Sequence, residues 1–180
     1  METLNWTEQV PGIWRATVGE PEDIDPLSLL GILPRQEALQ RLGTASFPLD
    51  DQSIMASVTP CRTVIRLPLA AEEHLYGLGL QFMKVNHRGR TRYLRVNSDP
   101  KQDTGETHAP VPLYLSSRGY GVLVNTARIV TICCGSTLRR EYPGKISDRN
   151  TDPNWQATPL SDIVEIVVSA GGAEVYILAG

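Results

Sequence analysis

Nine short segments with strand-forming composition divide this chain, and nearly all of them are bounded by Gly, Pro, Asn or Asp. Nine strands in one domain imply two sheets packed face to face. We therefore expect an all-β fold, a two-sheet antiparallel β-sandwich. The expected strands are Gly12 to Val18, Ser53 to Thr59, Thr63 to Leu69, Thr91 to Val96, Pro112 to Leu115, Tyr120 to Asn125, Arg128 to Cys133, Ile163 to Val168 and Glu174 to Leu178.

The third of these segments alternates between apolar and polar residues. Ile65, Leu67 and Leu69 fall on one face of such a strand and Arg66 falls on the other, which is the pattern of a strand with one wet side. Because Pro68 cannot donate a ladder hydrogen bond, the strand is expected to end there or to lie at a sheet edge.

Two short segments that contain glycine predict tight turns. Ser116 to Gly119 separates two strong strands and ends in a glycine that can take positive φ, so it predicts a hairpin. Ser169 to Gly172 is a second such turn, between the last two expected strands. Only Arg35 to Leu42 has helical spacing, with Gly43 placed to stop it, so at most one short helix is expected.

The length of 180 residues fits a single domain spanning residues 1–180, with enough chain to bury a core without disulfides or metal. A complete β/α barrel, which needs about 250 residues, is excluded. A formal net charge of −3 gives no attraction to phosphate backbones or anionic lipid, so no nucleic-acid partner is expected. No apolar run approaches the roughly 20 residues of a membrane span, so no membrane partner is expected either.

The N-terminal segment from Met1 to Trp6 lacks the basic start and apolar centre of a secretory signal. With Met1 as the native start, the protein is expected to be cytoplasmic. The three cysteines, Cys61, Cys133 and Cys134, are expected to be small buried apolar side chains with one exposed thiol, which fits a reducing compartment.

No metal site is predicted. Adjacent residues of a strand point to opposite faces, so Cys133 and Cys134 cannot easily bind one ion together. His74 and His87 have no partners at the spacing of metal ligands. We therefore expect neither a metal nor a cofactor.

The stretch from Asn97 to Ala109 predicts a loop and holds the densest group of titratable side chains beside strong strands. Two carboxyl groups can act together as acid and base, or as acid and nucleophile, when they lie about 5 to 5.5 Å or about 6.5 to 9.5 Å apart. Asp99, Asp103 and Glu106 could supply such a pair on spacing alone. A solvated loop whose Asp and Asn side chains make local turn hydrogen bonds explains the same residues.

Three blocks of the sequence resemble the N-terminal β-sandwich of the family 31 glycoside hydrolases. They run from Leu75 to Phe82, from Val96 to Asp99 and from Pro112 to Thr126. The end of the chain, Ala173 to Gly180, is similar to the last strand of that sandwich, after which family members enter a catalytic β/α barrel. The sequence departs from its relatives at Leu80, where many members have Glu.

The resemblance implies a galactose mutarotase-like supersandwich that packs on a barrel expected after Gly180. The retaining α-glycoside hydrolase activity then belongs to the parent enzyme, whose nucleophile and acid lie on the barrel. No catalytic residue is expected in this chain, which alone should be inactive. The sandwich face that normally covers the barrel would be exposed, so self-association of the isolated domain is expected.

A loop of the sandwich reaches over the barrel mouth in this family, and Asp99 best matches the polar residue of that loop. Asp99 is therefore expected to accept a hydrogen bond from a sugar hydroxyl of an α-glycoside substrate. His108 is a weaker candidate for a second sugar contact or a general acid. A histidine that caps the following strand is the alternative for His108.

Two rival interpretations stay open. A free-standing mutarotase-like aldose epimerase needs a His acid and a Glu base, and Glu106 and His108 are the close pair of those types in a loop. Two residues apart, they would need special geometry to converge. A carbohydrate-binding or barrel-packing module without catalysis is the other alternative.

Overall fold

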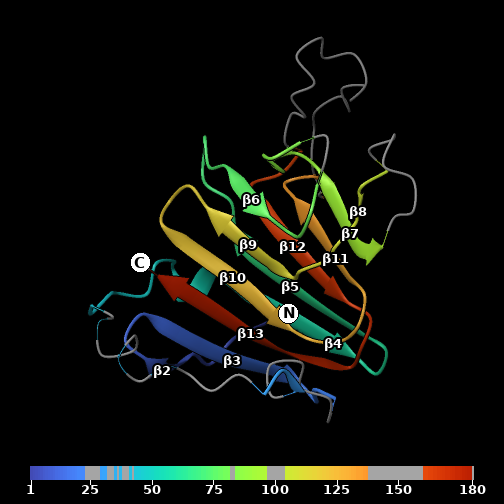
Figure 1. The fold of residues 1–180 in the computed structure, drawn as a ribbon. Coiled ribbons are helices and arrows are strands. Elements are labelled where there is room, and N and C mark those ends of the chain that lie inside the picture. The colour runs from blue at the N-terminus through green and yellow to red at the C-terminus, as the bar shows by residue number, and fades with distance from the viewer. Residues whose placement is uncertain are drawn as a thin grey trace.

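The computed structural model describes residues 1–22, 43–81, 84–96, 104–137 and 160–179, together with residues 29–31, 35, 37 and 41. Their strands form two sheets that lie face to face, with the six-stranded sheet toward the viewer in Figure 1. Neighbouring strands pair antiparallel in both sheets, except for one parallel pair among the described strands. The predicted two-sheet β-sandwich is therefore confirmed.

The seven-stranded sheet has the order β1-β4-β5-β12-β11-β7-β8. Its strands are β1 (Glu2–Thr3), β4 (Met55–Thr59), β5 (Arg62–Pro68), β7 (Thr91–Val96), β8 (Glu106–Thr107), β11 (Val130–Cys134) and β12 (Ile163–Val168). The parallel pair is β7 and β8, at one edge of this sheet.

The six-stranded sheet has the order β2-β3-β13-β10-β9-β6. Its strands are β2 (Thr7–Val10), β3 (Ile13–Gly19), β6 (Leu75–Gly77), β9 (Leu113–Ser116), β10 (Tyr120–Asn125) and β13 (Gly172–Ala179). A single turn of 3-10 helix, η1 (Asp51–Ser53), precedes β4. Within the described residues no helix is long and apolar enough to cross a bilayer.

All nine predicted strands are present, with ends that shift by a residue or two. The sequence did not predict β1, β2, β6 and β8, which have two to four residues each. Such short strands do not show a resolvable alternation of apolar and polar residues. The predicted helix from Arg35 to Leu42 lies largely outside the described residues and stays a prediction.

The two predicted turns have different outcomes. Ser116 to Gly119 is the expected hairpin between β9 and β10: Gly119 has a φ of 82° and its N–H donates to the Ser116 carbonyl at 3.1 Å. Ser169 to Gly172 was expected to join two paired strands, and this prediction is wrong. β12 pairs with β5 and β11, whereas β13 pairs with β3 and β10, so this connection crosses from one sheet to the other.

The core lies between the inner faces of the two sheets. Ile65, Leu67 and Leu69 are at most 3% exposed, as their alternation predicted. β5 ends at Pro68, which is one of the two predicted alternatives. It lies between β4 and β12, so it is not an edge strand. Val122 and Ile177 complete the layer from the facing sheet. Apolar burial on this scale is the main source of stability for such a domain.

The corner after β6 brings two backbone segments into close contact. Gly77, Leu78 and Gly79 have φ values of 101°, 62° and 94°, three left-handed residues in a row. A Cβ on Gly79 would lie 1.9 Å from the Ala109 carbonyl oxygen. The corner therefore needs glycine both for its backbone conformation and for the approach of the segment that contains His108.

We expect Gly79→Ala to lower the free energy of unfolding by more than about 2 kcal/mol, because the methyl group adds a backbone clash to left-handed strain. Urea unfolding followed by circular dichroism measures this loss. Gly43→Ala is the matched control, since a Cβ there meets nothing within 4 Å, and its effect should stay within about 0.5 kcal/mol. Equal losses in the two variants would contradict the close approach at Gly79.

Candidate functional site

The loop that carries the predicted substrate contact begins at the end of β7 and returns to the sheet at β8. Asp99, Lys101 and Asp103 lie outside the described residues, so the position of Asp99 stays a prediction. Both ends of the loop are described. The Tyr93 N–H donates to the Gly105 carbonyl at 2.8 Å, which fastens the returning chain to β7.

Glu106 is anchored where the loop returns. Its carboxylate accepts a hydrogen bond from the Arg95 guanidinium and a second from the Thr104 hydroxyl at 3.2 Å. The Arg95 guanidinium also lies 5.8 Å from the centre of the Tyr93 ring, within cation–π range. A carboxylate held in this way fastens β8 to β7, and it is not poised as a free general base.

His108 follows β8 and is half-buried. The backbone N–H of His108 donates to the Leu80 carbonyl at 3.2 Å, and the Thr107 hydroxyl donates to the same oxygen at 2.9 Å. The Leu80 N–H in turn donates to the Ala109 carbonyl at 3.3 Å. The structure therefore places His108 beside the glycine corner. Leu80, where many relatives carry Glu, is 51% exposed at the same corner.

A buried carboxylate that the sequence did not single out joins the β9–β10 hairpin to the chain after β5. Glu73 is 2% exposed and accepts hydrogen bonds from the Ser116 hydroxyl at 2.5 Å, the Tyr120 hydroxyl at 2.6 Å and the Ala70 N–H at 2.8 Å. Burial, followed by the contact with Glu73, raises the pKa of Tyr120 well above its ordinary value. Nothing in the sequence separates Glu73 from its exposed neighbour Glu72.

A second buried polar pair joins an arginine of β7 to a histidine of the preceding loop. Arg92 is 1% exposed and points into the sandwich, where its Nε donates to Nδ1 of His87 at 3.1 Å. With Nδ1 accepting, the Nε2 of His87 carries the proton and donates to the Gly77 carbonyl at 3.0 Å. His87 therefore links the edge strand of one sheet to β7 of the other.

The cysteines behave largely as the sequence predicted. Cys61 is exposed, Cys133 is half-buried and Cys134 is buried, and all three are free thiols. Burial raises the pKa of Cys134 to about 12, which makes it unreactive at neutral pH. Within the part of the chain that the structure describes, no three His, Cys, Asp or Glu side chains come close enough to hold a metal ion.

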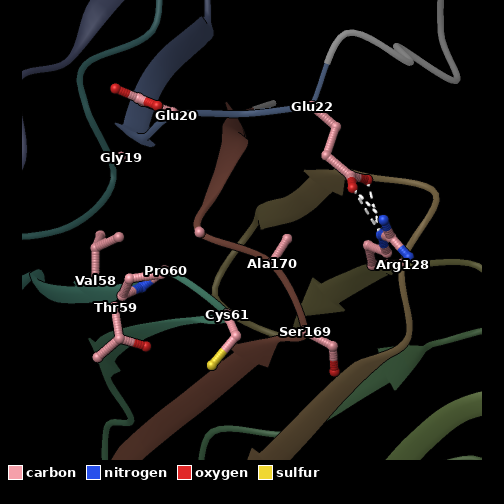
Figure 2. Close-up of a pocket in the computed structure, with 11 residues that line it drawn as sticks. Gly19, Glu20, Glu22, Val58, Thr59, Pro60, Cys61, Arg128, Ser169 and Ala170 are labelled. Carbon is pink, nitrogen blue, oxygen red and sulfur yellow. Dashed lines mark hydrogen bonds and ion pairs between the residues drawn. The ribbon is translucent and has the colours of Figure 1, made fainter.

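A hollow of about 770 Å³ opens where the end of β3, the β4–β5 turn and the β12–β13 connection meet (Figure 2). At its rim the Nε–H of Arg128 is shared between the two oxygens of the Glu22 carboxylate, at 2.8 and 2.9 Å, and Nη2 of Arg128 also donates to that carboxylate. These bonds hold the pKa of Glu22 below its usual value. None of the described residues that line the hollow is aromatic, so it offers no stacking surface for a sugar ring.

Residues 43–132, half of the chain, match the family described as the glycosyl hydrolase 31 N-terminal galactose mutarotase-like domain. This range begins before the first block of the sequence resemblance and contains all three blocks.

Three solved structures show the same fold. A cycloalternan-forming enzyme from Listeria monocytogenes matches 98% of this chain, with 12% identity and a TM-score of 0.52. A GH31 dextranase from Flavobacterium johnsoniae matches 73%, with 16% identity and a TM-score of 0.51. A cycloalternan-degrading enzyme from Trueperella pyogenes matches 76%, with 18% identity and a TM-score of 0.51. The chain spans 18%, 13% and 18% of their respective lengths.

Replacing Glu73 tests the buried polar cluster. We expect Glu73→Gln to lower the free energy of unfolding by about 1 to 3 kcal/mol, because the amide cannot accept from the Ser116 and Tyr120 hydroxyls and the Ala70 N–H as the carboxylate does. Chemical denaturation at pH 7 measures the change. The neighbouring substitution Glu72→Gln is the control and should change stability by less than about 0.5 kcal/mol; an equal effect of both would show that the cluster contributes nothing.

Proposed function

We propose, since this chain belongs to the glycosyl hydrolase 31 N-terminal galactose mutarotase-like domain family, that it is the N-terminal accessory domain of an α-glycoside hydrolase. The family match over half of the chain carries this proposal, and the two-sheet sandwich supports it. In this proposal the domain packs on a catalytic β/α barrel and lends a loop to the substrate pocket. The substrate is an α-linked carbohydrate, and the protein binds neither nucleic acid nor membrane.

The chemistry is assigned to the barrel, and the surroundings of two carboxylates support that assignment. Glu73 is buried inside the sandwich among hydroxyl donors, and Glu106 is bound by Arg95 and Thr104. Neither is arranged as one of two opposed carboxyl groups that flank a glycosidic bond. The same contact of Glu106 counts against an aldose epimerase that uses Glu106 as base and His108 as acid.

Asp99 is proposed to touch the substrate as a hydrogen-bond acceptor for a sugar hydroxyl. Support comes from both ends of its loop, which are fastened to the sheet edge. The Arg95–Glu106 ion pair and the hydrogen bond from the Tyr93 N–H to the Gly105 carbonyl hold them there. His108 is the weaker candidate, on the returning chain beside the glycine corner. A loop whose ends are fixed in this way can hold a contact in place while its tip faces a partner domain.

A cytoplasmic location is part of the proposal and is supported by the free thiols. Cys61 is exposed and unpaired, and Cys133 is half-buried and unpaired. Exposed thiols of this kind persist most easily in a reducing compartment.

The isolated 180-residue chain should not hydrolyse an aryl α-glycoside, whereas the full polypeptide of the parent gene should. Release of the chromogenic aryl group measures both. Turnover by the isolated chain that survives further purification would contradict the placement of the catalytic groups on the barrel. A parent gene that encodes no barrel after Gly180 would refute the accessory-domain function itself.

In the full enzyme, Asp99→Asn should lower kcat/KM for an α-glycoside by about 10-fold to 100-fold, because loss of a charged acceptor weakens the hydrogen bond to a sugar hydroxyl by roughly 1.5 to 3 kcal/mol. Steady-state kinetics measure the effect. Asp51→Asn, in η1 on another segment, is the matched control and should leave kcat/KM unchanged. Equal rates for both variants would remove Asp99 from the substrate site.

A further inference from the structure

A buried histidine connects the glycine corner of one sheet to an arginine of the other sheet. His87 and Arg92 are each 1% exposed, and the Arg92 Nε donates to Nδ1 of His87 at 3.1 Å. On the opposite side of the ring, Nε2 of His87 donates to the Gly77 carbonyl at 3.0 Å. The neutral imidazole therefore accepts on one nitrogen and donates on the other, as only its uncharged form can.

The loop that carries this ring is attached to both sheets. The His87 N–H donates to the Leu75 carbonyl on β6 at 2.8 Å, and the His87 carbonyl accepts from the Arg90 N–H at 2.9 Å. Two residues after the histidine, the Gly89 N–H donates to the Cys134 carbonyl on β11 at 2.6 Å. These backbone bonds hold the imidazole between the sheets.

Protonation of His87 is incompatible with its bond to Arg92. An imidazolium carries a hydrogen on each nitrogen, so Nδ1 can no longer accept from the guanidinium. The guanidinium keeps its charge throughout the pH range of folded proteins. A protonated ring would therefore place two positive charges on atoms that lie 3.1 Å apart, away from water.

Two titratable groups on neighbouring strands stay neutral in acid. Burial raises the pKa of Cys134 on β11 to about 12, despite the nearby charge of Arg92. Burial also raises the pKa of Tyr114, the β9 partner of Gly77, well above its usual value. Neither neutral group can offset a positive charge on His87.

The described charged groups nearby either add positive charge or are engaged in other bonds. Arg88 and Arg90 flank His87 on its own loop, and Nη1 of Arg88 donates to the Ala70 and Glu73 carbonyls at 2.9 and 2.7 Å. The Glu73 carboxylate, whose charge acts on the neighbouring β9 tyrosine, already accepts three hydrogen bonds. These surroundings favour the neutral form of His87.

The glycine corner, residues 77–79, depends on contacts of this kind. All three residues are left-handed, and Leu78 with a φ of 62° is not a glycine. Such a backbone persists only where its surroundings hold it. The corner continues into Leu80, whose N–H donates to the Ala109 carbonyl and whose carbonyl accepts from the His108 N–H. A change at the corner is therefore transmitted to the chain around His108.

We propose that His87 is a pH-sensitive switch built into this sandwich. Neutral His87 connects the glycine corner to Arg92 on β7. Protonated His87 keeps its donor to Gly77, but repulsion from Arg92 drives the ring out of the sandwich, and the corner and the chain around His108 open. The switch lies wholly within this domain, so it goes beyond the proposed accessory function and does not depend on it.

The direction of the pH dependence follows from the two states. The closed state holds His87 without a proton, whereas an imidazole released to water titrates at about pH 6.5. The open state therefore binds more protons, and the closed state loses stability as the pH falls below about 6.5. Carboxyl groups with ordinary pKa values near 4 contribute little above pH 5.5.

Amide hydrogen exchange of the 180-residue chain, followed by NMR at pH 7.5 and pH 5.5, tests the switch. Corrected for the intrinsic pH dependence of exchange, protection of the Leu78, Leu80 and His108 amides should fall by about tenfold at the lower pH, the factor that one released histidine supplies over this range. Amides of the β5–β12 pair are the internal control and should change by less than about twofold. An equal fall at both places would contradict a local switch.

His87→Gln separates the switch from other titrations. Glutamine carries an acceptor and a donor but does not titrate, so protection of the corner in this variant should change by less than about twofold between the two pH values. His74→Gln is the matched control, because His74 is half-buried and bonds to the Asn86 side chain, and this variant should keep the tenfold fall. A tenfold fall that survives in His87→Gln would refute the switch.

Imidazole nitrogen NMR shifts of the unmodified chain give a measurement that does not require any variant to fold. His87 should show the Nε2–H tautomer at pH 7.5, as its two bonds require. Its protonation at lower pH should coincide with the loss of protection at the corner. An Nδ1–H tautomer, or a ring that gains its proton while the corner stays protected, would overturn the assignment.

Discussion

Burial of apolar side chains between two sheets is the constraint on which this structure depends. Each long strand sends alternate side chains inward, and residues such as Ile65, Val122 and Ile177 meet in one shared layer. The alternation also dictates what remains outside. β9 has apolar residues on both faces. Tyr114 packs in the core, whereas Leu115 points outward and adds nothing to the core. On β9 the outward side chain, Leu115, is 52% exposed.

Polar groups inside the sandwich connect the segments around its β6 edge. Glu73 joins the β9–β10 hairpin to the chain between β5 and β6, and the Arg92–His87 pair bridges the two sheets. Buried groups of this kind are costly unless every bond is made, so they specify one arrangement of the loops around them. The same edge contains the glycine corner and the chain on which His108 lies. Hydrogen bonds continue up to the root of the predicted substrate loop, where the Tyr93 N–H donates to the Gly105 carbonyl.

Prediction from sequence worked where a signal is local. The period of two residues located nine strands, and a glycine located the β9–β10 hairpin, because both depend on neighbouring residues alone. It did not work where the outcome depends on distant contacts. Ser169 to Gly172 has the composition of a hairpin but crosses between sheets, since β13 finds its partners in β3 and β10. Arg92 belongs to a basic stretch and yet lies inside, where the Nδ1 of His87 accepts its hydrogen bond.

The sequence by itself determined that this is a two-sheet β-sandwich and to which family its motifs are similar, because alternation and motif residues are properties of short segments. It also located Asp99 and His108 as candidate contacts, of which the described structure places His108 beside the glycine corner. Only the tertiary structure decided the sheet order, the burial of Glu73 and the alignment of Tyr76, Leu115 and Leu178 into one apolar row. Those features arise when strands far apart in the chain become neighbours, and no short segment of sequence contains that information.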